Sequence, residues 1–550
     1  MGIPGADKFF VRALVRARAV RPPAHVDWAI VDVAIALFVI HAGVHRMRNT
    51  DPSESIALAD FVARGVRYIR RFCELAPVVV VACDVTGGPA AKGPTQAARR
   101  ASAAPMSESE RADFFERGII PSIASVRATP GARSHLMRAL LDALLASPGH
   151  TAPGGMILLH GHPDAPDSVI TLTTSADGAG APARAESRIA LQHEADTQIA
   201  HWAGVLARPG LVQANDKDML LILALQHALA RARAHDGRAP DVTLFMHSAS
   251  YFFYVSELTQ ARAAEAEDKL RAIDADGLRA YDAPFVSIAR AVDEMAALPG
   301  SAGLSVLDAV ANMTFLLTAF ACDFNLGNWY SRITLDTVYA AWDALGRRAP
   351  RFVACTLRAP AAAGSAAEAP ADSEGAPAGA PAGAPATGPA RVHVTLDERA
   401  FALFIGAELC APPPKLTPAG RPSRARGRPM PAASDIDAAA RRALWTLLYW
   451  LHASLGAGDA GAPNALARCE RTGLSLWGWD RAPDGRVVEA RAVAPDLGPE
   501  RAAVASLAPL APVRGRKRPR ETSGGGVADA RAPLAPPVRA MLQTDDYEPE

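Results

Sequence analysis

The chain has 550 residues, 49% of them hydrophobic, and a formal net charge of +1. This length is enough for two or more units with their own cores, together with extended segments. The balanced charge excludes a global field that would draw the whole chain to nucleic acid or to an anionic membrane, so such contacts would depend on local clusters.

The beginning of the chain predicts a flexible basic arm over residues 1–22, followed by a helical core over residues 23–358. Helical patterns cover Val26–Arg48 and Ser53–Leu75. In the first of these, Asp27 and Asp32 interrupt the longest apolar run, which leaves it too short for a membrane span. Basic residues in the arm break any signal-peptide core. We therefore expect an intracellular protein without integral membrane insertion.

Only a few short strands are predicted within this core. Val78–Cys83 is a β-branched run that favours one buried strand. Met156–His160 and Ser168–Thr174 favour two more, which His162-Pro163-Asp164 would join. The remaining periodic segments predict helices, at Ser107–Arg117, Ser134–Leu145, Ser187–Leu206, Lys217–His235, Val242–Ala272 and Ala283–Ala297.

The strongest helical signal is Leu304–Leu345, LSVLDAVANMTFLLTAFACDFNLGNWYSRITLDTVYAAWDAL. Its apolar residues step by three and four, which places them on one helical face. Asp308 and Asn312 interrupt that face. The Asn325-Leu-Gly327-Asn328 run predicts a break, because glycine tolerates the left-handed backbone that ends helices. A second helix then carries aromatic residues, and we expect both helices to pack in the core of the protein.

The second half of the chain is expected to alternate between order and disorder. Residues 359–390 are rich in Ala, Gly and Pro and cannot bury enough apolar surface to offset chain entropy. Residues 391–495 predict a second helical segment that packs on the core, with a basic disordered loop at 411–433. Residues 496–550 predict a disordered tail. The fold expected from these patterns is mainly α, a multi-helix globular body with few short strands plus disordered inserts rich in Pro, Ala, Gly and Arg.

No cofactor site is predicted. Gly88-Pro-Ala-Ala-Lys92-Gly93-Pro94-Thr95 comes close to a phosphate-binding loop, but such a loop needs Lys directly after its second Gly. Pro94 stands there and also removes a backbone donor. The six cysteines form no Cys-x-x-Cys pair, and their apolar surroundings indicate free buried thiols in a reducing compartment. They are Cys73, Cys83, Cys322, Cys355, Cys410 and Cys469.

No catalytic or metal site is predicted either. His160-Gly-His162 with Asp164 could suggest a metal site, but no Cys or His cluster elsewhere in the sequence has the spacing of metal ligands. A pair of loop histidines is the interpretation we adopt. An enzyme whose site is assembled from distant residues remains an alternative, and this His160–Asp164 segment is its only candidate.

Three features of the tail predict partners. A basic cluster favours a nuclear import signal, with RNA or phosphate contact and a merely solvated charge run as alternatives; its residues are Arg514, Arg516, Lys517, Arg518 and Arg520. Pro509 and Pro512, followed by Arg514, fit a PxxP motif that aromatic grooves bind. Tyr547 lies among acidic residues and is a candidate for phosphorylation, or else part of an inert acidic terminus.

From about Ser134 to Leu455, the order of the helical patterns resembles the alphaherpesvirus tegument phosphoproteins that modulate the virion transactivator. The closer resemblance is to the type called virion protein 11/12, with the sister type 13/14 as the second choice. The segments that carry it are SHLMRALLDALL, TLFMHSASYFFYVSEL, SVLDAVANMTFLLTAFACDFNLGNWYSRITLDTVYAAWDALGRRAPRF and VTLDERAFALFIGAEL.

This resemblance implies a non-enzymatic scaffold or adaptor in the virion tegument and in the cytoplasm and nucleus of the host. Its implied partners are other tegument proteins and the virion transactivator, with host kinases or import receptors as further candidates. A nucleus-shuttling adaptor that binds RNA through its arginine-rich segments is the alternative.

Overall fold

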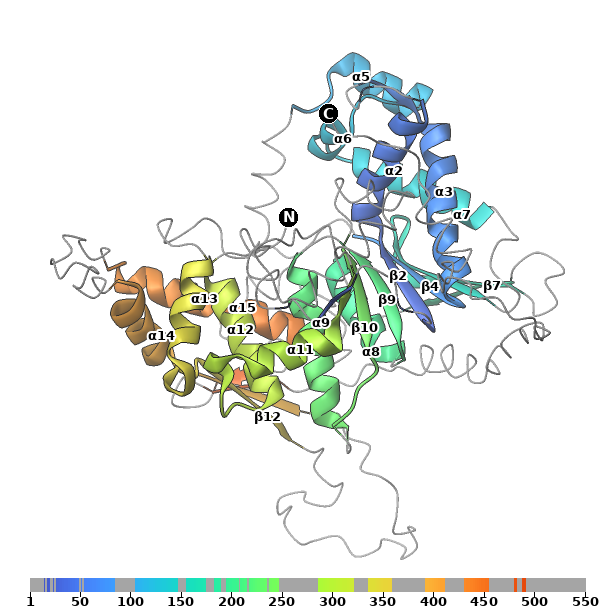
Figure 1. Ribbon diagram of the computed structural model, residues 1–550. Helices are drawn as coiled ribbons and strands as arrows, with labels where there is room; N and C mark the ends of the chain where they lie inside the picture. Colours follow the sequence, from blue (N-terminus) through green and yellow to red (C-terminus); the bar gives the residue numbers. More distant parts are fainter. Residues whose placement is uncertain are drawn as a thin grey trace, which may run out of the picture.

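In the computed structural model, chain placement is described for part of the sequence: residues 14, 17–19, 23, 26–48, 51, 54–84, 104–146, 155–174, 183–188, 194–206, 208–214, 217–234, 237–246, 285–320, 335–358, 391–410, 430–454, 479–481 and 487–490. These residues form a nine-stranded sheet with helices on both faces, a four-stranded sheet and a small two-stranded sheet (Figure 1). The protein is therefore an α/β protein, and the expectation of a mainly α body with few short strands is wrong.

Five parallel strands make up the centre of the large sheet. Their spatial order is β10-β9-β2-β4-β6. The first of these five in the chain, β2, thus lies in the middle, and the later ones are added first on one side and then on the other, which is the doubly wound order. The five strands are β2 (Trp28–Asp32), β4 (Val78–Ala82), β6 (Met156–His162), β9 (Gly210–Ala214) and β10 (Val242–Met246).

Antiparallel strands extend the sheet at both sides. On the side of β6 they are β7 (Ala165–Thr173) and β8 (Ala183–Arg188), and on the side of β10 they are β11 (Phe285–Ser287) and β1 (Arg18–Ala19). Among these, β6 and β7 form the hairpin that the sequence predicts around residues 163–164.

Two cores lie on the two faces of the sheet, because the central strands are buried on both sides. In β2, Trp28 and Ile30 belong to one cluster of buried residues, while Ala29 and Val31 belong to the other. Such strands carry continuous apolar runs rather than alternating ones. This is why their sequences are hard to tell from buried helices.

The helices from the first half of the chain cover one face of the sheet (Figure 1). They are α2 (Val33–Arg48), α3 (Leu58–Leu75), α6 (Ile123–Ala128) and α7 (Ala132–Ala146). Short elements complete this region: β3 (Ile56–Ala57), α5 (Glu108–Ala112), the π-helical turn η2 (Asp113–Arg117) and β5 (Ile119–Ile120).

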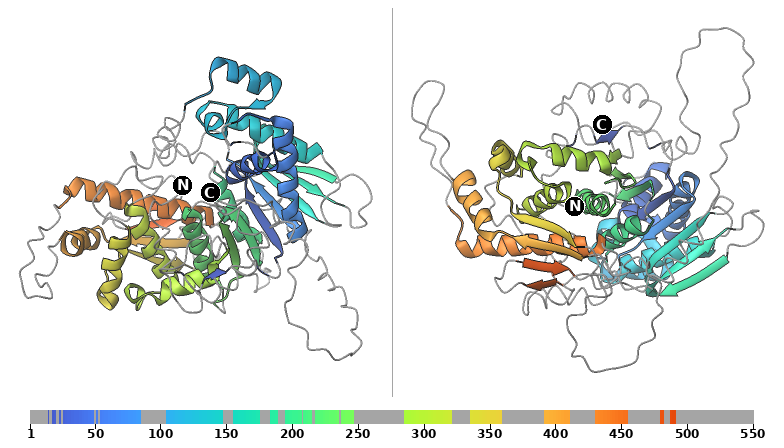
Figure 2. Two further views of the ribbon diagram at one scale, coloured as in Figure 1. Left: turned by 45° about the horizontal axis from the view of Figure 1, so that its top comes forward. Right: turned by 90° about the horizontal axis from the view of Figure 1, so that it is seen from below.

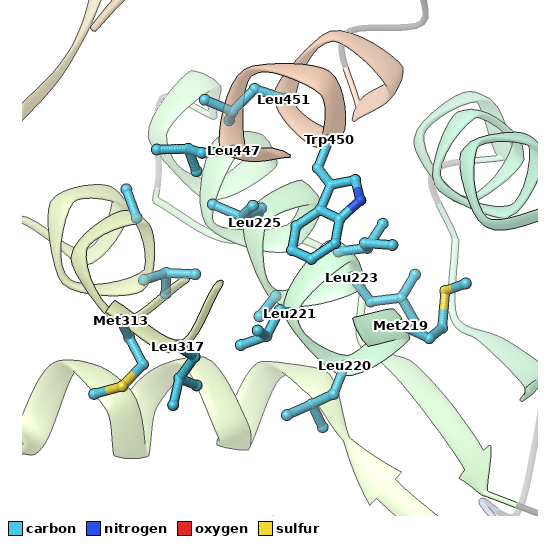
Figure 3. Packing of buried hydrophobic residues seen from close by; sticks show 14 of the residues in the cluster. Met219, Leu220, Leu221, Leu223, Leu225, Met313, Leu317, Leu447, Trp450 and Leu451 are labelled. Carbon is cyan, nitrogen blue, oxygen red and sulfur yellow. The ribbon is translucent and has the colours of Figure 1, made fainter. Parts of the chain in front are cut away.

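The other face carries the larger core. Its helices are α8 (Ala195–Leu206), α9 (Lys217–Arg233), α11 (Ile288–Ala297), α12 (Val306–Phe320) and α15 (Ala433–Ser454). Helix α9 lies in the middle and is buried on all sides from Asp218 to Leu229, as Leu221 and Leu223 on its different sides show. Figure 3 shows that Met313 and Leu317 of α12 and Trp450 of α15 approach it from separate sides. One continuous core thus joins the two halves of the chain.

The four-stranded sheet lies beside these helices (Figure 2). Its order is β12-β13-β15-β14, and its strands are β12 (Val353–Arg358), β13 (Arg391–Leu396), β14 (Trp479–Arg481) and β15 (Val487–Ala490). Around it lie α13 (Leu335–Ala344), α14 (Glu398–Phe404) and the turns η5 (Pro299–Ser301), η6 (Gly346–Arg348) and η7 (Ile405–Leu409). Strand β12 contacts α12 directly.

Most differences between the predicted elements and the structure have one form: the sequence pattern predicts a single helix where the structure has a strand followed by a helix. The predicted helix Val26–Arg48 contains β2 and α2, and the helical segment predicted over 391–495 begins with β13, which α14 follows. Val242–Ala272 begins with β10, and its residues after 246 lie outside the described ones. The segments Ser53–Leu75, Ser187–Leu206 and Ala283–Ala297 likewise begin with, or overlap, a strand.

The expected disordered segments 359–390 and 496–550, and residues 411–429 of the basic loop, lie outside the described residues. The same holds for most of the arm at 1–22. Among the helices that are described, none is both long and apolar enough to span a membrane.

Candidate functional site at the carboxyl edge of the sheet

The carboxyl ends of the parallel strands are the first place to look for a site in this architecture. In doubly wound folds, ligands bind outside these ends where the strand order reverses. Here the strand order reverses between β2 and β9. Strand β2 leads into α2, and strand β9 leads into α9. Charged and polar side chains gather at the ends of β2, β4 and β6.

Asp32 is the last residue of β2, and α2 begins at the next residue. Its Oδ1 accepts hydrogen bonds from the backbone N–H of Ala34 at 2.8 Å and of Ile35 at 3.4 Å. The side chain thus caps the helix in the manner usual for aspartate. Asp32 is 4% exposed. Burial, and then the charge of Asp84, raise its pKa to about 7, against the opposing effect of Arg133.

Asp84 lies two residues beyond the end of β4 and joins two helices to it. Its Oδ2 accepts a hydrogen bond of 2.6 Å from Arg133 in the first turn of α7. Its Oδ1 accepts one of 2.8 Å from the backbone N–H of Ala195, where α8 begins. Both oxygens are therefore occupied by groups of the protein. The side chains of Arg133 and Asp84 are 39% and 33% exposed, so screening by solvent weakens the ion pair between them.

Gln198 and Cys83 form a second joint between α8 and β4. The side-chain N–H of Gln198 donates to the carbonyl of Cys83 at 2.8 Å, and the Cys83 N–H donates to Oε1 of Gln198 at 3.0 Å. The same Cys83 N–H also approaches the carbonyl of His160 at 3.1 Å. Burial raises the pKa of the Cys83 thiol far above its ordinary value, so this thiol is uncharged and unreactive at neutral pH.

The two histidines of the predicted loop pair lie in β6 and point to opposite faces. His160 accepts a hydrogen bond from Nε1 of Trp202 in α8 at 3.0 Å, while His162 lies 3.2 Å from Asp142 in α7. They are buried in a strand, so their placement in a loop is wrong. Residues two apart in a regular strand share a face, so the opposite directions of these two side chains reflect the β-bulge between them. Gly161 between them has φ +80, where glycine is favoured.

His160 is fully buried, and burial together with His201 lowers its pKa well below the ordinary value. Its ring is therefore neutral at neutral pH, and its Nε2 has no hydrogen-bond partner. The residues that the structure describes contain no group of three or more His, Cys, Asp or Glu side chains that could hold a metal ion.

The predicted tail sites all lie outside the described residues. These are the basic cluster Arg514, Arg516, Lys517, Arg518 and Arg520, the motif of Pro509, Pro512 and Arg514, and Tyr547. The Gly88–Thr95 segment also lies outside them. The sequence patterns did not predict that Asp32, Asp84, Arg133 and Gln198 form a group. One signal was available, because both aspartates follow short β-branched runs and so mark strand ends.

Comparison of the chain with known protein families finds no family model that matches it, and comparison with curated proteins finds no match either.

Proposed function

We propose that this protein is a non-enzymatic scaffold or adaptor of the virion tegument. In this role it binds other virion components and modulates transactivator-dependent viral gene expression, in the virion and then in the cytoplasm and nucleus of the host. The resemblance of its helical segments to the tegument phosphoproteins is the basis for the viral part of this proposal.

The non-enzymatic part of this proposal is supported by the hydrogen bonds at the carboxyl edge of the large sheet. There, Asp32 and Asp84 bind the starts of α2 and α8, and Arg133 binds Asp84. The carboxylate of Asp32 occupies the start of the helix where a dinucleotide-binding protein of this topology would place a phosphate. These side chains hold the protein together, which favours a structural use of this edge.

The continuous core supports the adaptor part. Buried residues from Leu14 to Leu451 belong to one cluster, so surfaces from distant parts of the chain keep a constant arrangement. Tyr449 of α15 also lies 3.4 Å from Glu194 next to the start of α8, which links the second half of the chain to the large sheet. A constant arrangement of surfaces is what a protein needs to hold several partners at once.

The test is quantitative recovery of co-purifying proteins from infected cells, with the full-length chain and with residues 1–510. The shorter chain keeps every described element and lacks the basic cluster and Tyr547. We expect both chains to recover tegument components or the transactivator, which would place binding in the folded body. Recovery of RNA and RNA-bound proteins alone, lost with the tail and on nuclease treatment, would contradict the proposal and favour the RNA adaptor.

A further inference from the structure

Strand β8 is an open edge of the nine-stranded sheet. It pairs with β7 along Ala183–Arg188, and within the described part of the chain no strand pairs with its outer side. Figure 1 shows this end of the sheet at the rim of the molecule. The exposed residues of β8 are Ala183, Arg184, Ala185 and Glu186. Such an edge presents a row of backbone N–H and C=O groups that can pair with another chain.

Two other sheet edges are closed. Strand β1, at the opposite end of the large sheet, has only two residues, and Arg18 in it is 7% exposed. At β12, the side chains of Asn312 and Asp308 bind the backbone of the strand. Short edge strands and covered edges are usual means by which proteins prevent pairing between chains. Strand β8 has neither, so it is the edge at which another chain is able to pair.

The charges of β8 indicate which chain fits this edge. Arg184 and Glu186 are two residues apart and therefore share one face of the strand. Charged side chains on an edge strand usually discourage pairing. Here, however, the two neighbouring charges have opposite signs, so a strand that carries the same two charges and runs in the opposite direction matches them. A second copy of β8 is such a strand.

A two-fold axis between the copies restricts the register, because one residue of the strand must then face its own copy. Five of the six residues of β8 pair only when that residue is Ala185 or Glu186. About Glu186, two glutamates would face each other, and like charges directly opposite are destabilising. About Ala185, Arg184 of each copy faces Glu186 of the other, so two pairs of opposite charge form.

We propose that two copies of this chain associate through antiparallel pairing of their β8 strands, centred on Ala185, so that their nine-stranded sheets become one continuous sheet. A contact through one edge strand is smaller than most stable interfaces, so the dimer dissociates on dilution. This inference goes beyond the proposed function and does not depend on it, because it concerns contact between copies of the chain and not contact with other virion components.

The test is the molar mass of the full-length chain in sedimentation equilibrium, from about 1 µM to about 100 µM. For the wild type, we expect a rise from monomer toward dimer. Arg184→Glu and Glu186→Arg each place like charges opposite each other, so each should raise the dissociation constant of the dimer about tenfold or more. Arg399→Glu is the matched control and should behave as the wild type. It changes an exposed charge on α14, which lies at the opposite side of the molecule from β7 (Figure 1).

A mixture of the two single variants tests the register. The Arg184→Glu chain carries two acidic residues at these positions, and the Glu186→Arg chain carries two basic ones, so a heterodimer should form as readily as the wild-type dimer. The substituted side chains are exposed, so each variant should keep the unfolding temperature of the wild type. Should either not fold, the other alone still tests the charge pairs. A monomeric wild type, an unchanged dissociation constant in a folded single variant, or no heterodimer in the mixture would each overturn the proposal.

Discussion

The side chain of Asn312 in α12 replaces a neighbouring strand for Val353 at the edge of the four-stranded sheet. Its Nδ2 donates to the carbonyl of Val353 at 2.7 Å, and its Oδ1 accepts from the N–H of the same residue at 3.1 Å and from that of Phe352 at 2.7 Å. Asp308, one turn earlier, accepts from the N–H of Cys355 at 2.7 Å. The two polar residues that interrupt the apolar face of α12 are therefore what attaches the second sheet.

We predict that Asn312→Leu, which has similar volume, lowers the free energy of unfolding by about 3 kcal/mol, since it leaves several buried backbone groups without partners. Denaturant unfolding measures this directly. Thr314→Val is the control on the same helix, because the buried Thr314 hydroxyl has no hydrogen-bond partner. That change should be neutral or stabilising by about 1 kcal/mol. Equal loss in the two variants would show that polar pairing is not the cause.

The joint between Gln198 and Cys83 gives a second prediction. Gln198→Leu should cost about 1–3 kcal/mol, because the buried carbonyl of Cys83 loses its side-chain donor. The Cys83 N–H keeps its hydrogen bond to the carbonyl of His160. The free energy of unfolding should therefore fall by less than in Asn312→Leu. Unfolding in denaturant of both variants, measured side by side, tests this order. A larger loss for Gln198→Leu would contradict it.

The change of the free energy of unfolding with pH should depend on Asp32. Its pKa is raised from 3.8 to about 7 in the folded protein, so the folded state holds this proton more tightly than the unfolded state. The stabilising contribution is fully present below the unfolded value and is lost as the pH rises through about 7. Above that pH, the free energy of unfolding of Asp32→Asn relative to the wild type should therefore be higher than it is at acidic pH, by up to about 4 kcal/mol. Unfolding measured from acidic to alkaline pH would reveal it, and parallel curves would exclude it.

Close packing between β2 and β9 gives a prediction about a single glycine. A Cβ built on Gly210 would lie 2.1 Å from the ring of Trp28, which is held by a hydrogen bond of 2.9 Å from its Nε1 to the carbonyl of Arg208. Gly210→Ala should thus cost about 3 kcal/mol through overpacking. Gly43→Ala is the comparison, because Gly43 lies within α2 and the atoms nearest to an added Cβ belong to the flexible end of Arg64. This substitution should raise the free energy of unfolding by up to about 1 kcal/mol. Thermal unfolding distinguishes the two.

The sequence predicted helices better than strands, for a physical reason. The helical periodicity of 304–345 predicted α12 and α13, although the break at 325–328 lies outside the described residues. In contrast, β2 runs into α2 with no residue between them, and its apolar residues are buried on both faces. Nothing in such a run separates strand from helix by periodicity.

The candidate site could be predicted only in part. Asp84 directly follows the β-branched run at 78–83, which indicates a strand end, and Asp32 is the last residue of β2. However, Asp84 meets Arg133 and Ala195 across 49 and 111 residues. Contacts over such separations follow from the order of strands in the sheet, which the patterns of a single chain do not contain.

We predict that the carboxyl edge of the large sheet holds the protein together and does not receive a nucleotide or dinucleotide. The most direct measurement is the unfolding temperature of the full-length chain with saturating nicotinamide and flavin dinucleotides and nucleoside triphosphates, for the wild type and for Asp32→Asn. We predict no saturable shift in either, because internal bonds occupy the starts of α2 and α8. A saturable shift in the wild type that changes in Asp32→Asn would contradict the account and identify this edge as a ligand site.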